Sequence, residues 1–194
     1  MNAQVIITRQ NRAHQRQQGL SLVELSVVTV VVLLIAVLAV PVIQGYLVEN
    51  KVPKVGEALA HFVLRQHLNT TAHGQPQYQG MNTQHFAQQN KDSAVFSFAD
   101  QGAQTVVHHG LGKNGELQIV ERDGGESLEL RLTNVHHAAC PALATVMHRL
   151  ANEISVGPQG QQVVVKDPAL DYNAFFAQQQ CADGEVNTFS FVVY

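Results

Sequence analysis

An uncharged apolar run at residues 25–43 constrains the fold of this chain more than any other feature. As an α-helix its nineteen residues span roughly 30 Å, which is about the hydrocarbon thickness of a bilayer. The run therefore predicts a membrane-spanning helix. A carboxylate, Glu24, lies at its N-terminal edge. An unpaired carboxylate in a bilayer costs about 3 kcal/mol, so such a residue indicates a pairing partner or a function.

Basic residues precede the run, and an acidic remainder follows it. Arg9, Arg12 and Arg16 lie in the first nineteen residues, which contain no Asp or Glu. The positive-inside rule therefore predicts a cytoplasmic N-terminus, with the chain after Tyr46 outside. From residue 20 onward, nine Lys and Arg stand against fifteen Asp and Glu, a formal net charge of −6. This balance argues against nucleic acid as the main ligand, because phosphate binding needs a clustered basic face.

A cleaved secretory signal peptide is the competing interpretation, since it also joins a basic region to an apolar one. Two features disfavour it. The run is longer than the usual apolar region of a signal peptide, and the sequence that closes it, "PVIQGYLVENKVPK", contains no A-x-A-like cleavage site. The small residue at a plausible cleavage position is Gly19, and it precedes the run.

The stretch "QQGLSLVEL", followed by the apolar run, resembles the prepilin signature of type IV pilins and the related pseudopilins. The resemblance is specific over residues 12–50. It implies that a prepilin peptidase cuts between Gly19 and Leu20 on the cytoplasmic side and that Leu20 is then N-methylated. Pro41 matches a helix-kinking proline of family members that resemble this chain.

The resemblance also implies a partner for Glu24. Cleavage creates an α-amino group on Leu20, and in a filament the Glu24 carboxylate of a neighbouring subunit can neutralise it. A buried charge is tolerated when it is paired and is costly when its partner is removed. The alternative is that Glu24 only reaches toward the lipid headgroups. The implied partners are other pilin subunits in a homopolymer, the prepilin peptidase, and the inner membrane with its pilus assembly machinery; no cofactor is expected.

After Tyr46 the apolar residues recur at spacings of three and four, which is typical of an amphipathic helix. They are Val48, Val52, Val55, Leu59, Phe62 and Val63. The helix is expected to continue to about residue 71, with bends at Pro41 and Pro53 because proline removes a backbone donor. Alternatively, "KVPKVGE" ends one helix and begins another. Residues 72–92 predict a loop with a short helix at 83–89.

Short alternating segments separated by glycine-containing turns then predict an antiparallel meander. The segments are residues 94–99, 104–109, 116–120 and 127–132. A helix is expected at 139–154, and two further strands in "QQVVVK" and "VNTFSFVVY". Together these elements predict an α+β fold in which a long N-terminal helix packs on an antiparallel sheet. The expected organisation is a leader at 1–19, a hydrophobic membrane and assembly helix at 20–48, and a globular head at 49–194.

Two cysteines, Cys140 and Cys181, lie in the last third of the chain. An even pair in an oxidising compartment predicts one disulfide, and the outside location inferred above makes the pair oxidisable. The bond would close a loop of about forty residues and stabilise the head by roughly 4 kcal/mol. Two unrelated buried thiols are the alternative.

We expect neither catalysis nor a metal site. Adjacent residues of a strand point to opposite faces, so the histidine pairs 108–109 and 136–137 cannot each chelate one ion from a regular strand, and we expect ordinary surface histidines. The sequence contains no G-x-S-x-G, H-E-x-x-H or P-loop motif. Four acidic residues of the head are expected to form a solvated surface: Glu121, Asp123, Glu126 and Glu129.

The leading hypothesis is a structural subunit of a type IV pilus. The long leader, leucine directly after the cut, the resulting length of 175 residues and a helix beside Cys140 resemble the type IVb group, which includes thin-pilus pilins of conjugative plasmids and bundle-forming pilins. Such a subunit would first lie in the inner membrane with a periplasmic head, then enter an extracellular filament for adhesion, aggregation or conjugation. The alternatives are a pseudopilin of a type II secretion system and an uncleaved, membrane-anchored periplasmic binding module.

Overall fold

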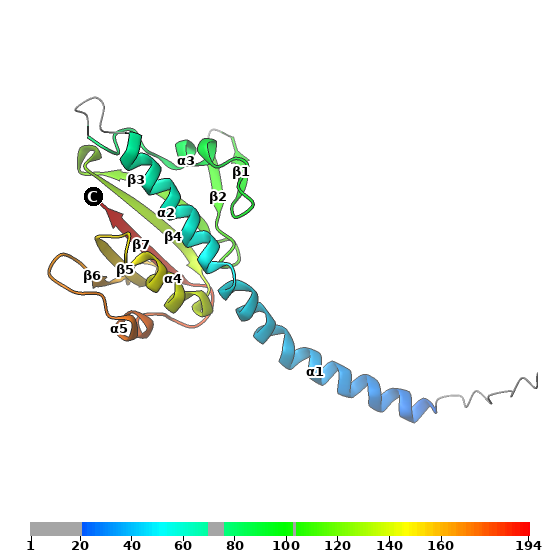
Figure 1. Cartoon of the computed structure of the whole chain (residues 1–194). Coiled ribbons are helices and arrows are strands. Elements are labelled where there is room, and N and C mark those ends of the chain that lie inside the picture. Colours follow the sequence, from blue (N-terminus) through cyan, green and yellow to red (C-terminus); the bar gives the residue numbers. More distant parts are fainter. Residues whose placement is uncertain (1–20, 70–75, 103) are drawn as a thin grey trace, which may run out of the picture. The chain divides into compact units, whose positions relative to one another are not determined.

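The computed structural model describes residues 21–69, 76–102 and 104–194 of the chain. The chain divides into two units, residues 1–40 and 41–194. Within the first unit, helix α1 (Leu22–Glu49) begins at Leu22 and continues into the second unit. The second unit contains a seven-stranded sheet and the helices that pack on it (Figure 1).

Two helices, α1 and α2 (Val52–Asn69), replace the single long helix that the sequence predicts. The prediction of a continuous helix is wrong at the junction, and the alternative of two helices is correct. There the Lys51 amide donates to Val48 O at 3.0 Å, three residues back, which tightens the turn. Pro53 has no amide hydrogen to donate to Glu49 O, so regular α-helical bonding is interrupted.

The amphipathic face of α2 packs on one face of the sheet (Figure 1). Five of its side chains are at most 1% exposed: Val52, Val55, Leu59, Phe62 and Val63. Burying each of them contributes roughly 2 kcal/mol. The opposite face of α2 carries exposed charged residues, among them Glu57 and Arg65. The three- and four-residue spacing in the sequence thus predicts correctly which face of α2 is buried.

The sheet is antiparallel throughout, with the strand order β1-β2-β3-β4-β7-β5-β6. Its strands are β1 (Ser97–Gln101), β2 (Gln104–His108), β3 (Glu116–Arg122), β4 (Ser127–Val135), β5 (Glu153–Pro158), β6 (Val163–Lys166) and β7 (Asn187–Val193). β1 to β4 form the predicted meander, although β1 begins three residues later than predicted. β7 comes last along the chain yet lies between β4 and β5.

Side chains at the centre of the sheet alternate between an apolar and a polar face, as expected of strands. Leu130 of β4 lies opposite Phe191 of β7, and both are buried under the helices. The next pair, Arg131 and Ser190, belongs to the other face. One face of the sheet is therefore the core, and the other is lined by polar side chains.

Helix α3 (Thr83–Gln89) coincides with the short helix predicted in the loop. Asn82 caps it, because its side-chain oxygen accepts a hydrogen bond from the His85 amide at 2.9 Å. Phe86 of α3 packs edge-on against Phe62 of α2, with ring centroids 4.8 Å apart. The aromatic contact holds α3 against the core.

The predicted helix at 139–154 is wrong in its second half. α4 (Cys140–Met147) ends early, and the last residues of the predicted helix enter β5. Lys166 Nζ donates to the carbonyl oxygens of His148 and Ala151, each at 2.6 Å, and so satisfies acceptors at the end of α4. Pairing of β5 with β7 buries alternate side chains of β5 and outweighs the helical spacing in the sequence.

Candidate assembly site

The first unit presents an apolar helix whose side chains are exposed. Every side chain from residue 22 to 38 is exposed, and most are Val, Leu or Ile. A continuous apolar surface of this extent marks a contact with membrane or protein. Among the described residues, one helix has the length and apolar composition needed to cross a membrane, and it begins at Leu22. Because this segment is apolar all round, lipid or other apolar helices can surround it.

Glu24 lies in the first turn of α1 and is the one charged residue of its apolar part. Two neighbouring hydroxyl groups are satisfied inside the helix. Ser26 Oγ donates to Val23 O at 2.8 Å. Thr29 Oγ1 donates to Leu25 O at the same distance of 2.8 Å. The Glu24 side chain is exposed and forms no ion pair with any described residue, so it has the capacity to accept a partner from outside the chain.

The other residues of the predicted processing and assembly site are only partly covered by the structure. Gly19 and Leu20 lie outside the described residues, so cleavage between them stays a prediction. Pro41 lies within α1. The bend expected at Pro41 also stays a prediction.

A disulfide joins Cys140 and Cys181, as the sequence predicts, with their Cα atoms 6.3 Å apart. Cys140 is buried at the start of α4. Cys181 follows α5 (Ala174–Gln179), a short helix that the sequence does not predict. Among the side chains of α5, only Ala177 is buried. The disulfide is therefore a principal link between this weakly buried segment and α4.

His109 is fully buried, which corrects the expectation of a surface histidine. Its Nε2–H donates to Thr133 O at 2.9 Å, and its Nδ1 accepts from the Leu111 amide at 3.0 Å. Burial lowers the pKa of His109 from 6.5 to about 4; the hydrogen bond to Thr133 opposes this shift, and nearby His108 adds to it. The neutral ring therefore links the β2–β3 connection to β4.

The stability of the head is expected to fall by about 3 kcal/mol between pH 6.5 and pH 4 because of His109. The unfolded chain binds a proton at this residue below pH 6.5, whereas the folded chain does so only near pH 4. The contribution of neutral His109 to the stability of the head is thus fully present above pH 6.5 and is lost as the pH falls. Urea unfolding of the full chain in detergent micelles, monitored across this range, measures the effect.

The control for this pH dependence is a pair of histidine variants. His109→Gln should flatten the loss of stability between pH 6.5 and pH 4, whatever its effect at pH 7. His61→Gln, at an exposed position of α2, should leave the wild-type pH profile intact. Equal pH profiles for wild type and His109→Gln would contradict the assignment.

His136 and His137 form a second pair, and they lie in a turn after β4 instead of a strand. Their rings stack with centroids 4.4 Å apart, so the expectation that they point to opposite faces is wrong. Burial and the neighbouring His137 lower the pKa of His136, while Glu185 opposes the shift. In the part of the chain that the structure describes, no group of three or more His, Cys, Asp or Glu side chains could hold a metal ion.

The acidic residues of the head do not form one solvated surface. Asp123 and Glu126 are exposed and Glu121 is half-buried, but Glu129 is 4% exposed, so the prediction is wrong for Glu129. Glutamate is rarely buried without a partner. Strand alternation places Glu129 on the polar face of β4, where other side chains cover it.

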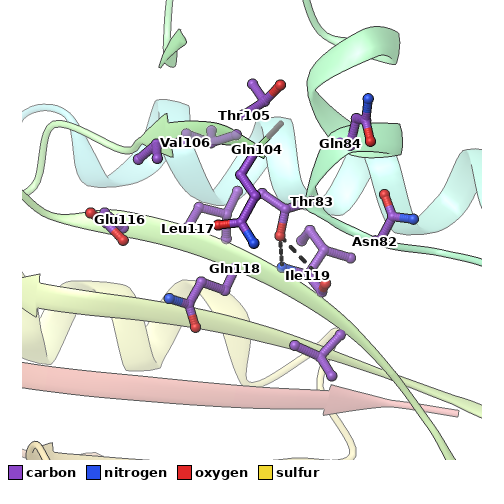
Figure 2. Close-up of a pocket in the computed structure, with 12 residues that line it drawn as sticks. Asn82, Thr83, Gln84, Gln104, Thr105, Val106, Glu116, Leu117, Gln118 and Ile119 are labelled. Carbon is purple, nitrogen blue, oxygen red and sulfur yellow. Dashed lines mark hydrogen bonds between the residues drawn. The ribbon is translucent and has the colours of Figure 1, made fainter. Parts of the chain in front are cut away.

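A groove of about 440 Å³, which the sequence does not predict, opens between α3, β2 and β3. β2 and β3 pair at only two positions before they diverge. Figure 2 shows Thr83 reaching from the start of α3 to Ile119 on β3, where its hydroxyl accepts from the Ile119 amide at 3.0 Å. Most polar side chains around the groove are neutral amides and hydroxyls, with Glu116 as the carboxylate. This lining suits hydrogen bonding more than acid–base chemistry.

Comparison with known proteins identifies the fold. No protein-family model matches the chain, and no curated protein does. The crystal structure of a type IV b pilin from Salmonella typhi is similar, with a TM-score of 0.50 and 14% sequence identity. The match covers 71% of this chain and 94% of that one. The arrangement of a long N-terminal apolar helix and a seven-stranded antiparallel sheet is therefore a pilin-like α+β fold.

Proposed function

We propose that this chain is a structural subunit of a type IVb-like pilus. Prepilin peptidase removes residues 1–19, Leu20 becomes the N-methylated first residue, and the apolar helix polymerises with those of other subunits. Before assembly the subunit lies in the inner membrane with its head in the periplasm. Afterwards it belongs to an extracellular filament that serves adhesion, aggregation or conjugation.

One observation carries this proposal: an exposed apolar helix with a lone carboxylate in its first turn precedes a head of pilin-like fold. A helix that only anchored a soluble domain would need no carboxylate at the edge of the bilayer, where an unpaired one is costly. A filament subunit needs it, because the α-amino group that cleavage creates requires a negative partner in the apolar filament core. The disulfide supports the same location, since such bonds persist outside the cytoplasm.

Gly19→Arg is expected to abolish processing and filaments. The prepilin resemblance places a small residue before the cut, and the arginine side chain would occupy that position at the peptidase. The full-length precursor should then remain in the inner membrane. Immunoblotting of membrane fractions and mass spectrometry of the N-terminus measure the cut, and electron microscopy counts the filaments.

Gln17→Arg is the matched control, because it adds the same charge to the leader and keeps Gly19. This variant should be cut and assembled normally. Mature protein that starts at Leu20 in filaments of the Gly19→Arg variant would refute the assigned cut. A native chain that retains its leader would instead favour the uncleaved membrane-anchored module.

A further inference from the structure

The polar face of the sheet holds a groove that the proposed function does not use. It has a volume of about 420 Å³, which lies within the range of small-molecule sites, roughly 300 to 1,000 Å³. Strands β3, β4, β5 and β7 form its floor, and the β5–β6 loop with Gln159 and Gln162 lines one side. Apart from Gly160, every residue that lines the groove has a polar side chain.

A buried carboxylate fixes one guanidinium in the floor of this groove. Glu129 Oε1 accepts hydrogen bonds from Arg131 Nε at 3.0 Å and from Arg131 Nη2 at 2.8 Å. The same oxygen accepts from Ser190 Oγ at 2.6 Å. Three donors on one oxygen hold the Glu129 side chain in place and fix the orientation of Arg131. The Glu129–Arg131 pair is a rigid part of the groove, because Glu129 is 4% exposed.

A second guanidinium in the groove, that of Arg122, is only loosely paired with a carboxylate. Arg122 Nε lies 3.7 Å from Glu129 Oε2, beyond hydrogen-bond distance, and about half of its side chain is exposed. Glu129 is the carboxylate among the lining residues, and Arg131 already neutralises it. The groove therefore carries a net charge of about one positive unit, which complements a monoanion better than a phosphate dianion.

Neutral hydrogen-bonding groups surround the two arginines. Gln118, Gln159 and Gln162 contribute amides, and Thr133 and Ser155 contribute hydroxyls. The Gln159 and Gln162 side chains form no hydrogen bond with other described residues, so their donors and acceptors are available to a ligand. A lining without apolar side chains gives no contact area to an acyl chain or to the apolar side chains of a peptide. It matches a ligand covered with hydroxyl groups.

From this geometry we infer that the groove binds a carboxylate-bearing saccharide. Arg122 and the free edge of Arg131 receive the carboxylate, since a guanidinium matches a carboxylate in shape and charge. The amides of Gln159 and Gln162 receive the ring hydroxyls. The inference goes beyond filament assembly and is independent of it, because the groove belongs to the head of a single chain.

The test is a ligand titration of the full chain in a detergent without a sugar headgroup, observed by saturation-transfer difference NMR. D-Glucuronate should bind saturably, and neutral D-glucose at least tenfold more weakly. Arg122→Gln should weaken glucuronate binding about tenfold without unfolding the head, because Arg131 still pairs with Glu129. Gln159→Ala should weaken glucuronate binding and leave acetate binding unchanged, since acetate has no hydroxyl groups.

Arg65→Gln is the matched control, because it removes the same charge from the exposed face of α2 and should leave glucuronate binding unaltered. Several results would overturn the inference. One is that glucuronate does not bind saturably, and another is that it binds equally well to wild type and to Arg122→Gln. The inference would also fail if acetate or inorganic phosphate bound as tightly as glucuronate, or if the peptide Asp-Gly-Glu bound more tightly than glucuronate. None of these results bears on cleavage at Gly19, so failure here leaves the pilin proposal to its own test.

Discussion

Glu24→Ala is expected to eliminate surface filaments while the subunit still inserts into the membrane and folds its head. Alanine is a good helix former and removes a charge from the bilayer, so insertion does not suffer. Each incoming subunit would nevertheless bury the α-amino group of Leu20 without its partner. Removing one member of a buried ion pair costs about 3 to 5 kcal/mol, which at every subunit contact is enough to stop polymerisation. Filament counts by electron microscopy, at matched membrane levels of subunit, measure the effect.

Two further variants separate charge pairing from other roles of this position. Glu24→Asp keeps the charge and should retain part of the assembly. Ser26→Ala removes a nearby polar group whose hydroxyl bonds within the helix, and it should assemble normally. If Glu24 only reached toward lipid headgroups, Glu24→Ala would yield as many filaments as wild type or more, and abundant filaments would rule out an assembly role for the carboxylate.

Cys181→Ser is expected to lower the free energy of unfolding of the head by about 4 kcal/mol. The disulfide links residues 41 positions apart, and the chain-entropy model gives about this value for a loop of that length. Cys181 is the better site for the change, because Cys140 is fully buried and a serine there would also bury a hydroxyl group. Urea unfolding of the oxidised full chain and of the variant measures the difference.

Reduction of the wild-type protein provides the internal control for the disulfide. Reduced wild type and Cys181→Ser should unfold at similar urea concentrations, and a reductant should not affect the variant further. Equal stability of oxidised wild type and variant would contradict the prediction. So would free thiols at both positions in protein taken from its native host.

Features set by neighbouring residues could be predicted from the sequence. The start of α3 is set by the capping residue Asn82, and the buried face of α2 follows from its apolar spacing. The meander β1 to β4 follows from alternation between glycine turns. In each case the signal lies within about fifteen residues, where backbone propensity and periodicity act directly.

The errors concern residues whose structure depends on distant partners. The end of α4 is set by Lys166 and by pairing of β5 with β7, neither of which is visible in the helical spacing of residues 139–154. Glu129 is buried because Arg131 and Ser190 bond to it, and Ser190 lies 61 residues away. The processing residues Gly19 and Leu20 rest on the motif alone, because they lie outside the described residues.

The place of β7 in the sheet determines when the head can fold. β4 and β5 both hydrogen-bond to β7, and neither bonds to the other. During synthesis the chain emerges with its N-terminal part first, so six strands are present before the seventh can join them. Contacts across such long separations make folding slow, because loop-closure entropy is lost before the contacts form. The sheet of the head therefore stays incomplete, with open strand edges, until residues 187–193 have been added. In this interval the head is most exposed to proteolysis and to incorrect strand pairing.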